Sequence, residues 1–334
     1  MLWYNIYMKL RLILTIVLTL FLFAYSTVAQ VPGEGSLELV VTPEIPKPNE
    51  EVVAVVRSSI TDLDRADISW IINGQTKISG KGVKSFSFKN GQLGEKTSLQ
   101  VIIVSSDGYS LSETVTFIPA SVSLVYEANS YTPPFYKGRA YFPYQGTGRV
   151  IAFPSFSDEN GPIDSSQLIF KWKEGNRVHE NASGFGKNTF AFSNTDKLPR
   201  PGEIGVEITS SDKQIIATET IIIEPTAPML ILYERKPNLG TLYNKALTDQ
   251  ALLSGDEMAV VASPFFFAVK DPNHKDLRYE WSLNGQDVPQ TQNSLVVRKP
   301  PNISGQALLS LRVWNTLRYY QFGTTDLNIS FSAN

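Results

Sequence analysis

The stretch DPNHKDLRYEWSLNGQ, residues 271–286, is the most informative part of the chain, because two earlier segments are variants of it. These are DLDRADISWIINGQ at residues 62–75 and DSSQLIFKWKEGNR at residues 164–177. Each copy consists of an acidic loop, a short strand-like run with one tryptophan, and a turn. Trp70, Trp172 and Trp281 follow one another at intervals of 102 and 109 residues, the length of one β-sandwich domain.

The position of the tryptophan in each run predicts its role. An apolar or aromatic residue stands two positions before it in every copy. Side chains two apart in a strand lie on the same face, so both should point inward between two sheets. The predicted core residues are Trp70, Trp172 and Trp281, preceded by Ile68, Phe170 and Tyr279.

A pair of alternating strands joined by a short turn follows each copy. The turns are Asp107-Gly108 in the first pair and Ser211-Asp212 in the second, and the third pair comprises residues 307–314 and 322–331. Pro119 and the segment from Pro225 to Pro228 mark the predicted boundaries between domains. We therefore expect an all-β chain with three β-sandwich domains, at residues 31–119, 120–225 and 226–334.

A second repeat lies at the start of the later two domains. LVYEANSYTPPFYKGRA, residues 124–140, matches LILYERKPNLGTLYNKA, residues 230–246, with Tyr136 and Tyr243 in equivalent places. The first domain has no such segment. We interpret the repeat as a first strand followed by a long structured connection near a domain joint.

These residues resemble a known type of domain. VKDPNHKDLRYEWSLNG, residues 269–285, is similar to the corresponding stretch of bacterial PKD-type and related immunoglobulin-like domains. The Tyr-Glu repeat followed by Ala262-Ser-Pro-Phe-Phe-Phe resembles uncharacterised exported proteins of candidate-phylum bacteria. The first two domains depart from the pattern, since one lacks Asp-Pro and the other inserts Gly161-Pro162. The resemblance implies three tandem immunoglobulin/PKD-like sandwiches, an extracytoplasmic setting and no catalytic residues.

The N-terminus carries a targeting signal. Lys9 and Arg11 precede the apolar run 12–25, and small residues up to Ala29 allow cleavage there. We expect residues 1–30 to be a signal peptide; the alternative is an uncleaved anchor, which would be the only link to a membrane. The chain has no cysteine, which favours a prokaryotic protein, secreted or at the cell surface.

Composition and motifs argue against several functions. The net charge is −2 and charged residues make up 19%, so nucleic acid is not an expected partner. The two histidines, His179 and His274, lie far apart, and no metalloprotease, nucleophile-elbow or phosphate-loop motif occurs. We predict no enzyme activity and no cofactor.

The acidic loop before each tryptophan is a candidate calcium site, because clustered side-chain oxygens suit this ion. The loop of the third domain offers Asp271, Asn273 and Asp276. The alternative is that these residues only form turns by bonding their own backbone. The corresponding sets in the other domains are Asp62, Asp64 and Asp67, and Asp158, Glu159 and Asp164.

An aromatic stretch in the second domain is the candidate contact surface for a ligand or partner. Aromatic faces stack on sugar rings or anchor protein partners, but they also fill domain joints, and both alternatives stay open. The residues are Tyr131, Phe135, Tyr136, Tyr141, Phe142 and Tyr144.

The leading functional prediction is a non-catalytic exported protein that serves as a spacer, adhesive or assembly module on the cell surface or envelope, of the kind that supports a pilus or surface layer. Its partner is expected to be a protein or a surface glycan. The alternative is a carbohydrate-binding protein that uses the stretch 131–144. A third hypothesis is a polysaccharide hydrolase with carboxylates in its loops.

Overall fold

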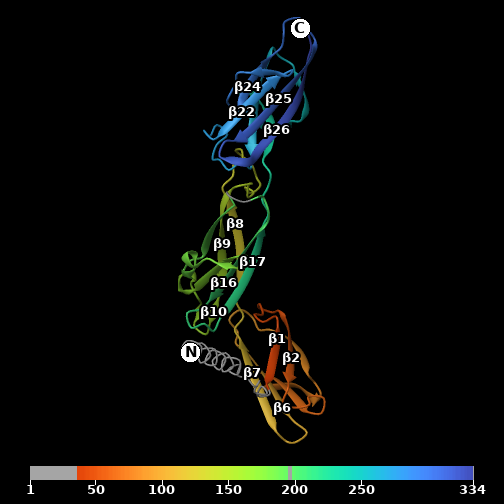
Figure 1. Cartoon of the computed structure of the whole chain (residues 1–334), viewed down its shortest axis with the longest axis vertical. Helices are drawn as coiled ribbons and strands as arrows, with labels where there is room; N and C mark the ends of the chain where they lie inside the picture. The colour runs from red at the N-terminus through yellow and green to blue at the C-terminus, as the bar shows by residue number, and fades with distance from the viewer. Residues whose placement is uncertain (1–35, 195–197, 334) are drawn as a thin grey trace, which may run out of the picture. The chain divides into compact units, whose positions relative to one another are not determined.

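The computed structural model describes residues 36–194 and 198–333, and this part of the chain is built almost wholly of strands (Figure 1). No α-helix occurs in it, and its two helical elements are 3-10 helices of three residues. Each sheet takes its strands from only one of three consecutive parts of the chain. The predicted fold class, all-β with three tandem immunoglobulin-like β-sandwiches, is confirmed.

The described chain divides into two compact units. One contains residues 36–41, 53–86 and 98–115, and the other contains 42–52, 87–97 and 116–333. The domain limits predicted above stay predictions, and the expected signal segment 1–30 lies outside the described residues. No helix in residues 36–194 and 198–333 is long and apolar enough to cross a membrane.

The first sandwich pairs a three-stranded sheet with a four-stranded one. Its strands are β1 (Leu37–Thr42), β2 (Glu51–Ser58), β3 (Asp67–Ile72), β4 (Gln75–Lys81), β5 (Ser85–Lys89), β6 (Thr97–Val104) and β7 (Ser110–Phe117). The strand orders are β1-β2-β5 and β4-β3-β6-β7, so the tryptophan strand β3 lies inside its sheet.

The second sandwich has the same plan with additional short elements. These are β8 (Ser121–Ala128), β9 (Thr147–Ser155), β10 (Ser157–Asp158), β11 (Gly161–Pro162), η1 (Ser165–Gln167), β12 (Ile169–Glu174), β13 (Arg177–Val178), η2 (Glu180–Ala182), β14 (Gly184–Phe185), β15 (Thr189–Ser193), β16 (Gly202–Thr209) and β17 (Ile216–Ile223). Its main sheets are β13-β12-β16-β17 and β15-β9-β8, and β10 pairs with β11.

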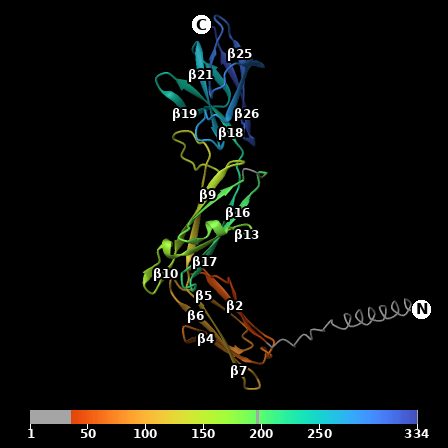
Figure 2. The ribbon, with the colours of Figure 1, turned by 60° about the vertical axis from the view of Figure 1, so that its left-hand side comes forward.

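The third sandwich adds strands that the sequence did not predict (Figure 2). Its elements are β18 (Met229–Lys236), β19 (Gly240–Leu247), β20 (Asp249–Leu253), β21 (Glu257–Phe265), β22 (Leu277–Leu283), β23 (Gln286–Val288), β24 (Ser294–Arg298), β25 (Gly305–Asn315) and β26 (Arg318–Phe331). The sheets are β19-β18-β21-β24 and β20-β26-β25-β22-β23. The last hairpin is longer than expected, because β26 begins at Arg318 and a bulge adjoins its turn.

The three tryptophans occupy equivalent buried positions. Their exposed fractions are 0% for Trp70, 0% for Trp172 and 1% for Trp281. In the first two sandwiches the indole stacks on a phenylalanine of the opposite sheet, Phe86 at 5.8 Å and Phe190 at 5.6 Å between ring centroids. The residues two positions before the tryptophans are buried as well. These side chains therefore fill the space between the sheets.

Each tryptophan also makes one equivalent hydrogen bond. The indole Nε1–H donates to a backbone carbonyl that lies two residues before a strand of the opposite sheet. The acceptors are Val83 at 2.8 Å, Lys187 at 2.8 Å and Gln292 at 2.9 Å, ahead of β5, β15 and β24. The indole thus joins the two sheets through both its apolar ring and its only donor.

Replacing Trp281 by alanine should lower the free energy of unfolding by about 3–5 kcal/mol, because the change leaves a large cavity and an unpaired carbonyl. Chemical denaturation of the full chain measures this loss. Tyr319→Ala, at a site that is 83% exposed, is the control and should stay within about 0.5 kcal/mol of wild type. Equal losses from the two changes would contradict the core role of Trp281.

Candidate functional site

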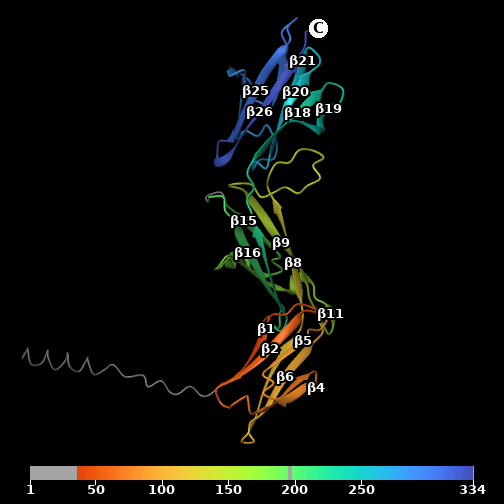
Figure 3. The same cartoon turned by 90° about the vertical axis from the view of Figure 1, so that its right-hand side faces the viewer.

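The connection between β8 and β9, residues 129–146, lies beside the third sandwich (Figure 3). The backbone N–H of Tyr131 donates to the carbonyl of Phe267 at 2.8 Å, and the N–H of Phe266 donates to the carbonyl of Tyr131 at 2.9 Å. The side chain of Tyr131 is buried in the hydrophobic core that contains Trp281. A residue expected to belong to the second domain is therefore part of the third sandwich's core.

The two copies of the Tyr-Glu repeat take different structures, which corrects the interpretation of both as a strand plus connection. After β18 the chain turns back at Gly240, whose φ of +72° suits glycine, and β19 pairs with β18. After β8 the chain continues into the connection 129–146 instead. Pro133 and Pro134 have no N–H group to donate to a sheet, which explains the difference.

Burial changes the acidity of Tyr131. Loss of hydration raises the pKa of its phenol to about 12, the nearby Tyr243 adds to the rise, and a hydrogen bond to Ser263 opposes it. The folded protein therefore keeps this proton at pH values where the unfolded chain, with a phenol pKa near 10, loses it. The stability that this group contributes is present below about pH 10 and is lost as the pH rises through 12.

Tyr131→Phe should make the loss of stability between pH 10 and 12 shallower, by an amount on the order of 2 kcal/mol at pH 12. Denaturation curves at a series of pH values provide the measurement. Tyr109→Phe, at a site that is 73% exposed, serves as the control and should leave the slope unchanged. Parallel curves for Tyr131→Phe and wild type would show that Tyr131 ionises normally.

A network around Gln321 holds the other end of the connection. The Gln321 side chain is fully buried, its amide donates to the carbonyl of Tyr144, and its Oε1 accepts from the N–H of Ala268 at 3.0 Å. The Arg318 side chain donates to the carbonyls of Gln145 at 2.8 Å and Ala268 at 3.1 Å. These hydrogen bonds connect residues 144–145 to the first residues of β26.

Gln321→Leu should lower the free energy of unfolding by about 1–3 kcal/mol or more, because buried polar groups lose their partner. Urea denaturation measures the difference. Gln306→Leu, at an exposed site in β25, is the matched control and is expected to have little effect. If Gln321→Leu were as stable as wild type, the network would have no structural role.

The structure divides the predicted aromatic stretch into different environments. Tyr131 lies in the third core, and Phe142 lies in the second core, 4.7 Å from Phe192 between ring centroids. Tyr144 is half-buried beside the Gln321 network. The remaining members are more accessible: Phe135 is 90% exposed, Tyr141 is 37% exposed, and Tyr136 is half-buried against Phe265. The stretch therefore serves packing at some positions and leaves others accessible.

Phe135 and Tyr136 lie along a groove of about 530 Å³ between the connection and the sheet that contains β18, β19 and β21. Buried rings form its base, with Tyr233 6% exposed and Phe265 4% exposed. We call this the aromatic groove; its lining residues are Pro133, Pro134, Phe135, Tyr136, Lys137, Tyr233, Thr241, Tyr243, Asn244 and Phe265.

The rings in the aromatic groove pack against each other edge to face. Tyr136 meets Phe265 at 5.6 Å between centroids with planes 78° apart, and Tyr233 meets Tyr243 at 5.2 Å with planes 65° apart. The ladder between β18 and β19 is irregular between its pairs at Tyr233 and Arg235, and such bulges re-aim side chains. The predicted site did not include Tyr233, Tyr243 or Phe265, although the repeat already paired Tyr136 with Tyr243.

Backbone features position Tyr136 and Phe135. A Cβ added at Gly138 would lie 2.5 Å from the Tyr136 ring, so the ring lies directly against the glycine. Phe135 has a φ of +64°, which is rare for a bulky residue, and its ring is almost fully exposed. An exposed aromatic side chain held in an unfavourable backbone conformation is typical of functional sites.

The predicted calcium ligands of the third loop have partners within the protein. Oδ1 of Asp271 accepts the N–H of Asn273 at 2.9 Å, and Oδ1 of Asn273 accepts the N–H of Asn293 at 3.3 Å. The carboxylate of Asp276 lies 3.5 Å from Nδ1 of His274. Turn chemistry accounts for the bond between Asp271 and Asn273, and calcium binding stays a prediction.

The acidic loops of the other two sandwiches contain similar turns. Oδ1 of Asp62 accepts the N–H of Asp64 at 3.0 Å, and Oδ1 of Asp164 accepts the N–H of Ser166 at 2.9 Å. Hydrogen bonds from the Ser166 hydroxyl and N–H hold the pKa of Asp164 below its usual value. Among the described residues, no three His, Asp or Glu side chains form a group that could hold a metal ion.

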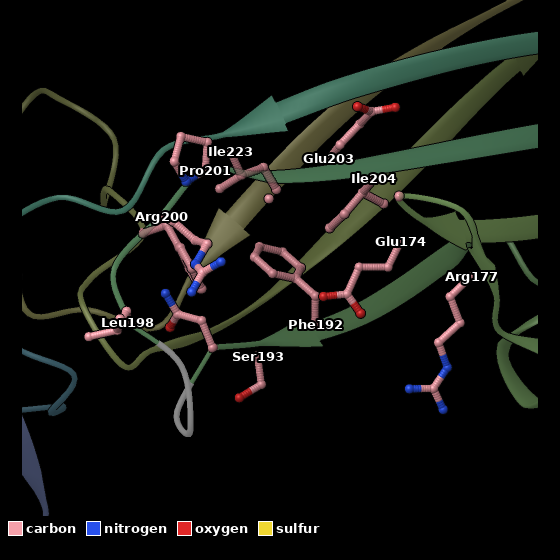
Figure 4. Close-up of a pocket in the computed structure, with 14 residues that line it drawn as sticks. Glu174, Arg177, Phe192, Ser193, Leu198, Arg200, Pro201, Glu203, Ile204 and Ile223 are labelled. Atoms are coloured by element: carbon pink, nitrogen blue, oxygen red, sulfur yellow. The ribbon is translucent and has the colours of Figure 1, made fainter.

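A second cavity of about 510 Å³ lies at one end of the second sandwich and carries both signs of charge (Figure 4). Its charged lining residues are Glu174, Arg177, Arg200 and Glu203. Residues 195–197, which connect two lining residues, lie outside the described part of the chain. We therefore assign the candidate site to the aromatic groove.

Comparison with known proteins gives only weak likenesses. No protein-family model and no curated protein matches the chain. Among solved structures it is similar to three N-terminal domains of the highly immunogenic outer capsid protein of bacteriophage RB49, at 11% identity over 90% of this chain and 99% of that one, with a TM-score of 0.27.

Two further structures are similar to the same degree. The central fibronectin-III array of RIM-binding protein has 10% identity over 89% of this chain and 96% of that one, with a TM-score of 0.28. The fibronectin(III)-like modules of Clostridium thermocellum CbhA have 11% identity over 57% and 94%, with a TM-score of 0.26. Likenesses this weak carry no functional argument, and the sandwich assignment rests on strand pairing.

Proposed function

We propose that this chain is a non-catalytic exported protein of a prokaryotic cell surface or envelope, with PKD-type sandwiches that serve as a spacer or assembly module and an adhesive surface in the aromatic groove. The partner is a protein or glycan of an envelope structure such as a pilus or surface layer. The basic and apolar N-terminal sequence and the absence of cysteine support export.

The observation that carries the proposal is the aromatic groove itself. Phenylalanine side chains normally lie in the protein interior, but Phe135 is 90% exposed at the edge of a groove whose base is aromatic. Exposed aromatic groups beside a concave apolar surface are typical anchors for binding partners. An adhesive role uses this surface directly, whereas a pure spacer would not need it.

Phe135→Ala in the full chain should weaken binding to a cell-envelope preparation of the producing organism about tenfold, because the change removes an exposed anchor without disturbing the core. A sedimentation assay with labelled protein measures the binding. The matched control is Tyr109→Ala, at another exposed aromatic site, and it should bind like wild type.

Two results would contradict the proposal. One is equal binding by wild type and Phe135→Ala. The other is polysaccharide turnover that disappears in Glu203→Gln, because it would make the cavity of the second sandwich a hydrolytic site.

A further inference from the structure

The aromatic groove contains rings that lie nearly perpendicular to one another. The ring planes of Tyr136 and Phe265 lie 78° apart, so the Tyr136 ring forms a side of the groove and the Phe265 ring forms part of its base. Aromatic faces carry partial negative charge, and the C–H groups on the face of a pyranose carry partial positive charge. A sugar ring laid on such a face covers its apolar side and leaves its hydroxyl groups at the edge.

The polar groups of the aromatic groove match hydroxyl groups. Besides its tyrosines, the groove is lined by the hydroxyl of Thr241 and the amide of Asn244. Hydroxyl and amide groups both donate and accept hydrogen bonds, as sugar hydroxyls do. A proline-rich peptide also favours aromatic grooves, but its backbone offers mainly carbonyl acceptors and few N–H donors. Such a peptide would leave the hydroxyl and amide oxygens of the groove without a donor.

Charge around the aromatic groove differs from that of the chain as a whole. The lining contains Lys137 and no aspartate or glutamate. The two segments that form most of the groove, residues 129–146 and 229–247, contain five basic residues and one acidic residue, whereas the complete chain has a net charge of −2. The Arg235 side chain lies 3.3 Å from the Thr241 hydroxyl, at the lining itself. This local excess favours an anionic ligand.

From these three observations we infer that the aromatic groove binds an acidic glycan, a chain of pyranose rings that bears carboxylate or sulfate groups. The inference rests on the proposed adhesive function and names the ligand class of the same groove. A sugar ring lies on the faces of Phe135 and Tyr136, and an acidic group on the chain pairs with Lys137. The hydroxyls of the sugar bond to Thr241, Asn244 and the tyrosines.

The test uses the full chain and an array of uronic-acid, sulfated and neutral oligosaccharides, followed by titration calorimetry with the strongest ligand. We expect binding to acidic members, with much weaker binding to the carboxyl-reduced or desulfated form of the same backbone. Affinity should fall as salt is raised, because exposed charges are screened.

Variants separate the contributions of stacking and charge. Phe135→Ala should weaken glycan binding about tenfold. Lys137→Gln should weaken it about two- to fivefold at low salt and remove part of the salt dependence. Lys89→Gln, at an exposed lysine of the first sandwich, is the matched control and should bind like wild type.

The outcomes distinguish this inference from the proposed function. Binding only to neutral glycans, binding to a proline-rich peptide instead, or no binding on the array would overturn the acidic-glycan inference. If envelope binding were still lost in Phe135→Ala but unaffected by periodate treatment of the envelope, the adhesive function would stand and its ligand would be a protein. If envelope binding did not depend on Phe135 either, both the acidic-glycan inference and the adhesive function would be wrong.

Discussion

One tryptophan side chain joins the two sheets of each sandwich, and the packing of the domain depends on this link. The indole fills the space between the sheets, and its Nε1–H donates to a carbonyl just before a strand of the opposite sheet in all three domains. Because a buried indole needs a partner for its single donor, the hydrogen bond fixes which loop must approach the ring.

The β8–β9 connection joins the second sandwich to the third in a similar way, through a buried aromatic side chain and hydrogen bonds to backbone carbonyls. Tyr131 enters the core of the third sandwich, and Gln321 of β26 bonds back to the carbonyl of Tyr144. The connection is thus held at both ends, while Phe135 between them is 90% exposed to solvent. A loop held in this way can present aromatic side chains at little entropic cost, because most of its backbone is already ordered. The aromatic groove is a product of this arrangement.

Several features of the site were visible in the sequence, and others were not. The stretch 131–144 contained Phe135 and Tyr136 of the aromatic groove, and the repeat pointed to Tyr243. The same pattern could not separate these residues from Tyr131 and Phe142, since burial depends on which sheet a side chain meets. The acidic loops could be interpreted as calcium sites or as turns, and the hydrogen bonds of Asp62, Asp164 and Asp271 within them are those of turns.

The all-β class and the three-sandwich plan could be predicted from the sequence, because the alternation around Trp70, Trp172 and Trp281 depends only on local strand geometry and on the need to bury large apolar side chains. The different paths of the two matching Tyr-Glu segments could not be predicted in this way and are seen only in the folded chain. One forms the hairpin β18–β19, whereas the other packs its aromatic residues into and against the third sandwich. The physical reason is that these positions depend on contacts between residues far apart in the chain, such as Tyr131 with Phe267 and Tyr136 with Phe265, which no local pattern records.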